Sequence, residues 1–211
     1  MQLRPDPRRR YSPERPWQPL SDDEWAVLSP FVLRAADAAG RPVRDPRGRP
    51  DAVFWLAAHT LPGRAPPPWA ALPAGFGKPD TASRQFRRWA KQGLWTRLLE
   101  ALADPDRPGI AVLRRLESWI CRAFRRAWRP LGVAGVALAR RLGFLSALRA
   151  PSWLLPDPDL SELVFRRVES VLDRLRDGSL RLAPPGFLRA AQRLLTAAAG
   201  RRYIPRSLAP P

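Results

Sequence analysis

The spacing of apolar and polar positions predicts helices along most of the chain, most clearly in the stretch PDTASRQFRRWAKQGLWTRLLEAL. Ala82, Phe86 and Trp89 follow one another at spacings of four and three, which places them on one face of a helix. The opposite face is cationic, with Arg84, Arg87, Arg88 and Lys91. Asp80 or Thr81 is expected to cap this helix, because a short side chain with an oxygen atom accepts a hydrogen bond from the first turn.

Earlier segments carry their own helix signals. Ser21 and Glu24 form a capping box, so a helix is expected to start there and to be ended or disturbed by Pro30. Its inner face would consist of Trp25, Leu28, Phe31 and Val32. A Gly/Pro/Arg loop follows, and then a largely apolar helix that Asp51 is expected to cap. Residues 62–79 are typical of a long turn held by the packing of Trp69, Leu72 and Phe76.

Together these segments predict a small helical domain over residues 20–104. Gly93 is expected to end or bend the basic helix, and a second apolar stripe follows at Leu94, Trp95, Leu98, Leu99 and Leu102. The order of a capped helix, an Arg-rich loop, a buried helix, a turn and a basic helix is of helix-turn-helix type. A short helix with cations outside suits a DNA major groove, although a solvated surface is the more common origin of such a face.

The second half of the chain is also helical in period. We expect helices over residues 108–128, 131–148 and 184–199, and a further one begun by Asp159 or Ser161. In the first of these, the inward positions are Val112, Leu116, Trp119, Ile120 and Ala123, and the outward positions are Arg115, Arg122, Arg126 and Arg129. The predicted fold is therefore all-α, with four parts: a disordered basic arm (1–19), a helix-turn-helix-like domain (20–104), an Arg-rich helical region (105–200) and a flexible tail (201–211).

The net charge of the chain adds to the predicted fold an indication of what the protein binds. The chain of 211 residues has a formal net charge of +18, and residues 105–211 hold twenty arginines against eight acidic residues. GC-rich coding explains arginine in place of lysine, but it does not explain the surplus of cations. Such a surplus favours a polyanionic partner, double-stranded DNA first and an anionic membrane surface second.

Few residues offer catalytic or metal chemistry. Cys121 and His59 are the single cysteine and the single histidine, so neither an internal disulfide nor a cysteine-based metal cluster is expected. A packed or surface role is the expectation for His59. The acidic residues near Glu162 and Asp173 alternate with arginines, which is typical of ion pairs on a helix surface. We expect no metal and no cofactor.

The residues expected to bind DNA lie on the basic helix and on the loop before the buried helix. On the helix they are Ser83, Arg84, Gln85, Arg87, Arg88 and Lys91; on the loop they are Arg41, Arg44, Arg47 and Arg49. The loop arginines are equally well interpreted as a solvated surface.

Several of these stretches occur in the order of a known family. LSDDEWAVLSPFV, GRPVRDPRGRPDAVFWLAAHT and PWAALPAGFGKPDTASRQFRRWAKQGLWTRLLEALAD resemble the N-terminal domain of bacterial insertion-sequence transposases of the DDE class. The resemblance covers roughly residues 20–104. It implies a domain that binds the ends of a mobile element during transposition, a form of DNA recombination, with the contacts near residues 85–88. The Pro-rich link LPGRAPPPW ahead of Trp69 is longer than the family pattern.

The chain departs from that family after Asp104. The family continues into a catalytic domain in which two Asp and one Glu hold two metal ions, and no strand with the first Asp follows here. We therefore expect a truncated, catalytically inactive transposase-derived protein that binds DNA and is not an enzyme. An intact transposase or a second copy of the chain are further expected partners. A separate interpretation, the third considered, is an active transposase.

The alternative is a basic helical interaction protein. Its arginine-bearing helices at 108–149 would lie on an anionic membrane or hold a partner protein. The first twenty residues have no apolar core typical of a secretory signal, and no apolar run is long enough to span a membrane. We expect a cytoplasmic protein of a bacterium, associated with the nucleoid.

Overall fold

A computed structural model of the chain describes residues 11–34, 45–60 and 65–200. Every regular element in these residues is helical, which confirms the all-α prediction. The chain divides into two compact units, the first ending at Arg149 and the second beginning at Ala150. Arg41 and Arg44 lie outside the described residues.

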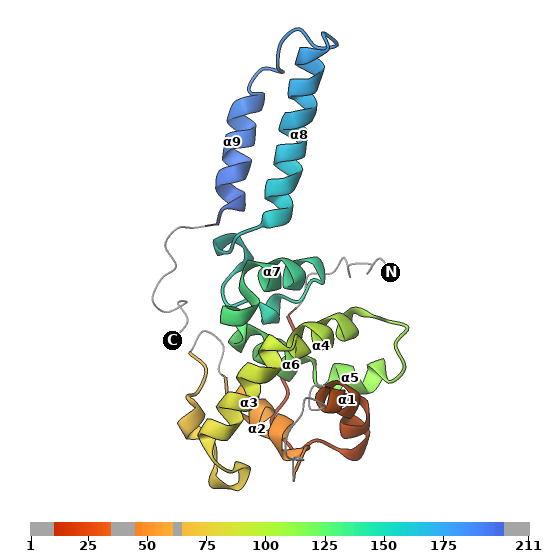
Figure 1. Cartoon of the computed structure of the whole chain (residues 1–211), viewed down its shortest axis with the longest axis vertical. Helices are drawn as coiled ribbons and strands as arrows, with labels where there is room; N and C mark the ends of the chain where they lie inside the picture. The colour runs from red at the N-terminus through yellow and green to blue at the C-terminus, as the bar shows by residue number, and fades with distance from the viewer. Residues whose placement is uncertain (1–10, 35–44, 61–64, 201–211) are drawn as a thin grey trace. The chain divides into compact units, whose positions relative to one another are not determined.

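Among the described residues, the first unit contains seven of the α-helices (Figure 1). They are α1 (Asp22–Arg34), α2 (Gly48–Ala58), α3 (Pro79–Lys91), α4 (Leu94–Ala103), α5 (Ile110–Arg115), α6 (Glu117–Arg126) and α7 (Trp128–Arg141). Three short 3-10 turns accompany them: η1 (Trp69–Ala71), η2 (Ala74–Phe76) and η3 (Leu145–Ala147). The second unit contains η4 (Ser152–Leu154), α8 (Pro158–Arg176) and α9 (Phe187–Ala198).

The capping box at the start of α1 is confirmed. The backbone N–H of Ser21 donates to Glu24 Oε2 at 3.0 Å, and that of Glu24 donates to Ser21 Oγ at 3.3 Å. Pro30 was expected to end or disturb this helix. It does not end it, because α1 continues to Arg34. Proline cannot donate to the carbonyl four residues earlier, and here the Ser29 hydroxyl donates to that carbonyl, of Ala26, at 3.3 Å.

Two helices start earlier than the sequence indicated. Asp51 does not cap α2, which begins at Gly48; its buried carboxylate accepts a hydrogen bond from the Leu20 N–H at 3.0 Å. Burial raises the pKa of the Asp51 carboxyl. Neither Asp80 nor Thr81 caps α3, because Pro79 occupies its first turn and Lys78 is the N-cap. Proline suits that position, where its missing N–H would have no partner in the helix.

The turn before α3 is packed as predicted. Leu72 joins a buried cluster with Leu56 of α2 and Ala82 of α3, and Trp69 and Phe76 pack against it. Residues 59–78 separate α2 from α3, whereas a helix-turn-helix has a turn of about three to four residues. The helix-turn-helix description therefore stays a prediction.

Helix α6 lies at the centre of the first unit and packs against α2, α4 and η3. Its side chains Trp119, Ile120 and Cys121 are fully buried, and Phe54 of α2 lies 5.6 Å from Trp119 between ring centroids. A single helix over residues 108–128 was expected, but Leu116 separates α5 from α6. The first unit therefore continues well past residue 104, because helices after that point fill its core.

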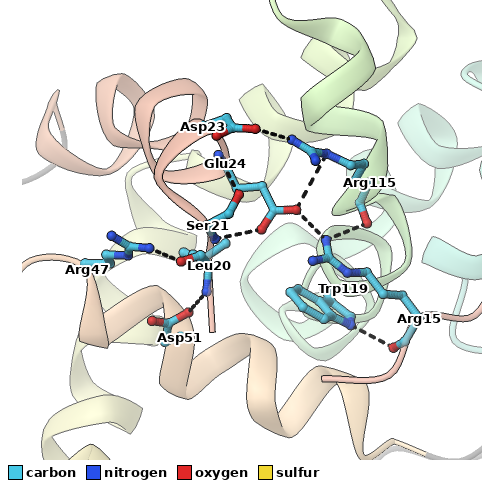
Figure 2. A network of polar contacts seen from close by, with 9 residues as sticks. All are labelled: Arg15, Leu20, Ser21, Asp23, Glu24, Arg47, Asp51, Arg115 and Trp119. Atoms are coloured by element: carbon cyan, nitrogen blue, oxygen red, sulfur yellow. Dashed lines mark hydrogen bonds and ion pairs between the residues drawn. The ribbon is translucent and has the colours of Figure 1, made fainter. Parts of the chain in front are cut away.

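A network of polar contacts holds the chain before α1 against α5 and α6 (Figure 2). Arg15 Nη1 lies 2.8 Å from Glu24 Oε1 and donates to the Arg115 carbonyl at 3.0 Å. Trp119 Nε1 donates to the Arg15 carbonyl at 3.1 Å, and the Arg15 guanidinium stacks over the Trp119 ring. Arg115 also pairs with Asp23 at 3.0 Å. Residues 11–19 thus have defined contacts, which differs from the disordered arm expected over residues 1–19.

The remaining helices broadly follow the predicted segments. α7 begins at Trp128 and has a non-helical kink at Gly132, and it ends at Arg141 rather than at residue 148. α8 is capped by Asp157, whose carboxylate accepts from the Leu160 N–H at 3.1 Å, and not by Asp159 or Ser161. α8 and α9 run side by side in opposite directions (Figure 1).

Candidate nucleic-acid interface

The inner face of α3 is fixed by aromatic packing. Phe86 and Trp89 are buried, as the apolar spacing predicted. The Phe86 ring lies between Trp69 of η1 and Trp95 of α4, at centroid distances of 5.4 and 5.2 Å, and Trp89 meets Trp95 edge-on at 6.1 Å. Since packed aromatic rings restrict rotation of the helix, the outer face of α3 has a defined direction.

The outer face of α3 carries cations without intramolecular ion pairs. Arg84, Arg88 and Lys91 are exposed and make no ion pair within the described residues. Arg87 is also exposed, and its guanidinium donates to the hydroxyl and carbonyl of Ser83, each at 3.4 Å. These cations lie on one face because they are separated by three or four residues. We call Arg84, Arg87, Arg88 and Lys91 the cationic face of α3.

Three other residues expected to bind DNA have partners inside the protein. Gln85 is buried, and its side-chain carbonyl accepts a hydrogen bond from Arg49 Nη1 at 2.8 Å. Arg47 pairs with Asp22 at 2.7 Å and donates to the Leu20 carbonyl. The sequence placed Gln85 on the basic helix and Arg47 and Arg49 on the loop before the buried helix, whereas Arg49 lies in the first turn of α2. It did not show that these side chains join α2 to α1 and α3.

The structure adds two exposed residues, at the start of α3, to the candidate DNA-binding residues. Lys78 precedes the helix, and Thr81 lies three residues before Arg84 and therefore on the same side. Asp80 is exposed in that first turn too and sets one negative charge beside the cationic face. Helical spacing from Arg84 and Arg88 would have identified Thr81, had it not been assigned to the cap.

Many arginines outside α3 are used by the fold. Arg122 donates to the carbonyls of Ala57 and Ala58 at the end of α2, and Arg126 donates to the Pro67 carbonyl at 2.8 Å. The Arg126 guanidinium also lies over the Trp69 ring, and burial lowers its pKa to about 10, so it stays protonated at neutral pH. These two were expected on the outside. Carbonyls at a helix end and an aromatic face are good partners for a buried guanidinium.

The candidate catalytic groups have structural partners. His59 Nδ1 lies 2.7 Å from the Trp55 carbonyl, and its ring stacks on that of Trp55, which confirms a packed or surface role. Glu162 pairs with Arg166 and Asp173 with Arg176, which confirms the interpretation of helix-surface ion pairs. Within residues 11–34, 45–60 and 65–200, no three His, Cys, Asp or Glu side chains group as a metal site would require.

No helix in the described part of the chain is long and apolar enough to cross a membrane.

Comparison with known proteins places the cationic face inside a family domain. No curated protein matches the chain, and no solved structure does. One family model matches residues 20–99, which run from the residue before the capping box to α4 and include all of α3. Residues 20–99 match an N-terminal transposase domain, by the family's description "Putative transposase of IS4/5 family (DUF4096)".

Proposed function

We propose that this transposase-related protein binds double-stranded DNA through the cationic face of α3. The observation that carries the proposal is the set of exposed cations on one rigid helix, of which Arg84, Arg88 and Lys91 have no ion pair in the described residues. Cations that already pair with carboxylates would have to exchange those partners for phosphates. The cations of α3 bind without that exchange.

The geometry suits the major groove. An α-helix fits the groove of B-form DNA, and a guanidinium reaches both acceptors of a guanine through its two parallel N–H groups. Arg84 and Arg88 are one turn apart on the outer face, so they would address neighbouring base pairs or the phosphates beside them. Lys91 and Lys78 lie towards the two ends of α3, where phosphate contacts would fix the helix in register.

We infer from the family match that the preferred sites are the ends of an insertion element. A protein that occupies such ends without cutting them would block an intact transposase, and it would act on the bacterial chromosome in the cytoplasm. The support for this inference is the transposase domain at residues 20–99 together with the expectation that the chain lacks a catalytic carboxylate trio.

The absence of cleavage is part of the proposal and has its own test. Supercoiled plasmid with the DNA that flanks the gene should stay intact with the full chain and Mg²⁺ or Mn²⁺. Metal-dependent nicking that is lost in an Asp157→Asn or Glu169→Gln variant would overturn this part and restore the interpretation as an active transposase.

The test of DNA binding uses the full chain and two DNA duplexes of equal length. One carries the sequence that flanks the gene, and the other is a scrambled version; fluorescence anisotropy is measured at about 50 and 200 mM salt. Selective binding that persists at the higher salt supports the proposal. Equal binding to both duplexes that disappears with salt would mean that net charge alone attracts the DNA.

The membrane-surface alternative has less support. It needs an apolar face of the helices in 108–149 to point outward, but α6 uses that face against α2 and α4. Flotation with anionic liposomes should therefore leave the full chain in the unbound fraction. Flotation that persists at physiological salt would favour the alternative.

A further inference from the structure

Exposed apolar side chains concentrate in the second unit. Among the described residues, ten large hydrophobic side chains are exposed, and seven of them lie between Ala150 and Gly200. They are Trp153, Leu163, Phe165, Leu172, Leu182, Leu188 and Leu194. Single exposed hydrophobic residues are ordinary, but a concentration of them in one small unit indicates an interaction surface.

The core between α8 and α9 is small. Val164 and Val171 of α8 and Ala191 and Ala198 of α9 are the buried residues of the two helices. Most of the stability of a helix in a protein comes from packing its apolar face, and this applies to α8 and α9 with their 19 and 12 residues. Two alanines contribute little apolar area, so this pair of helices gains from additional cover.

The uncovered residues are arranged on definite sides of the helices. Phe165 and Leu172 of α8 are seven residues apart, two turns, and so lie on the same side; they are 56% and 42% exposed. On α9, Leu188 is 67% exposed, and the half-buried Leu195 lies seven residues further along the same side. Apolar residues at a seven-residue spacing are typical of helices in a bundle.

Charge indicates what covers these residues. Residues 150–200 hold seven arginines and six acidic residues, whereas residues 105–149 hold ten arginines and two acidic residues. A nearly neutral surface is unsuited to DNA or an anionic membrane. The charged side chains of α9 are Arg189 and Arg193 alone, whereas α8 balances four acidic residues with four arginines. Glu169 lies four residues after Phe165 and three before Leu172, so it shares their side of α8; it is exposed and makes no ion pair in the described residues.

We propose that a second copy of this chain packs its α8–α9 pair against the first, forming a four-helix bundle. In a twofold arrangement α8 of each copy meets α9 of the other, so Glu169 of one copy approaches the arginines of the other, and the same pairing occurs twice. The exposed Phe165 and Leu172 then become core residues of the bundle. This inference does not depend on the proposed DNA binding, because it uses other helices and other chemistry.

The first test measures the mass of the full chain in solution without DNA, by sedimentation equilibrium from about 1 to 100 µM. The wild-type chain should be a dimer over part of this range, and Phe165→Glu with Leu172→Glu should weaken the dimer at least about tenfold. Leu182→Glu is the matched control, because Leu182 is 81% exposed and lies in the connection between the helices. Circular dichroism should show the same helix content in each variant.

The second test needs no apolar substitution and isolates the pairing of α8 with α9. Glu169→Arg and the double change Arg189→Glu with Arg193→Glu should each weaken self-association, because each places like charges together twice in a symmetric dimer. A mixture of the two variants should form heterodimers, because both contact regions then join opposite charges.

Two results would overturn the proposal. The first is a wild-type chain that stays monomeric up to about 100 µM, which would mean that another molecule or solvent covers the apolar side. The second is a dimer that neither the charge variants nor their mixture affects, which would place the interface elsewhere. Neither result decides the DNA-binding test, which compares two duplexes and concerns the cationic face of α3.

Discussion

Glu24 is the residue at which the first unit concentrates its buried charge. Its side chain is 1% exposed, and it accepts hydrogen bonds from Ser21 and Arg15 (Figure 2). Burial alone raises the pKa of this carboxyl, but the hydrogen bond from Arg15, the Ser21 N–H and the charges of Arg15 and Arg115 outweigh burial and lower the pKa below 4.5. One carboxylate thereby links α1, the chain before it and the end of α5.

Replacing Glu24 by Gln should destabilise the protein at neutral pH. We expect a loss of about 2–4 kcal/mol in the free energy of unfolding, because the change leaves two arginines without their shared partner. Chemical denaturation at pH 7 measures it. Glu162→Gln is the control: Glu162 and Arg166 form an exposed pair on α8, for which about 0.5 kcal/mol or less is expected. Equal effects of the two changes would contradict a structural role for Glu24.

The loss at Glu24 should depend on pH in a definite direction. A carboxyl whose pKa is lowered by folding stabilises the protein fully above its unfolded pKa, near 4.5, and loses that contribution as the pH falls through the folded pKa. The difference between wild type and Glu24→Gln should therefore be constant from about pH 6 to 8 and shrink below about 4.5. Burial raises the pKa of the Asp51 carboxyl, so the pH dependence of its contribution to stability is the opposite. That contribution is present at acidic pH and is lost as the pH rises through the folded pKa. A difference that grows on acidification would contradict the assignment.

For individual residues, contacts between neighbours in the sequence were predictable, and contacts between residues far apart in the sequence were not. The Ser21–Glu24 box follows from a spacing of three residues. The Arg15 and Arg115 contacts of Glu24 join residues far apart in the chain, and no short spacing indicates them. Gln85 is a similar case. It was predicted to bind DNA because no short spacing indicates its buried contact with Arg49, which depends on how α2 and α3 pack.

At the scale of elements, Gly93 sets the break between α3 and α4. Its φ is +72°, in the left-handed region that other residues adopt at a cost. Gly93→Ala should destabilise the protein by about 1–2 kcal/mol from backbone strain, since an added Cβ would have its nearest neighbour, Arg97 Nη1, at a comfortable 3.7 Å.

Gly75→Ala is the control for this prediction, measured by thermal unfolding of both variants. Gly75 has an ordinary φ, and an added Cβ would meet nothing within 4 Å, so a change near zero is expected. Gly93→Ala with the stability of wild type would mean that the break tolerates another geometry. Loss of stability in both variants would point to a cause other than the left-handed turn.

Helix identity was more predictable than helix ends. The apolar stripes of α3 and α4 are visible at spacings of three and four, and the structure buries them as expected. The ends depend on weaker local preferences: α2 begins at Gly48 instead of Asp51, and Leu116 divides a predicted single helix. In both places tertiary packing decides, because the Asp51 carboxylate and the Leu116 side chain are buried.

At the scale of the whole molecule, the first unit is larger than the segment that matches the transposase family. The match ends at residue 99, but α6 supplies Trp119, Ile120 and Phe124 to the core. The sequence predicted a boundary at residue 104 because the helix order and the family resemblance both end there. Composition does not report packing, and arginines beyond that boundary, such as Arg122 and Arg126, bind carbonyls of the earlier segment.

This arrangement predicts how truncated chains behave. Residues 1–104 should lack a cooperative thermal transition, because removal of α6 exposes the faces of α2 and α4 that it covers. Residues 1–149 should keep the transition, since they contain every helix of the first unit. Circular dichroism during heating distinguishes the two outcomes. A cooperative transition of equal temperature in both fragments would show that α6 is not needed for the fold.

The most direct test of the central claim compares two pairs of arginines in the full chain. Arg84→Ala with Arg88→Ala changes the cationic face of α3, and Arg167→Ala with Arg174→Ala removes the same charge from exposed positions on α8. Binding to the duplex that flanks the gene is measured by fluorescence anisotropy over a range of salt. We predict that the α3 pair costs about 1–3 kcal/mol per contact and lowers the salt dependence, whereas the α8 pair leaves both nearly unchanged. Equal losses from the two pairs would contradict the account, because net charge rather than the outer face of α3 would then bind the DNA.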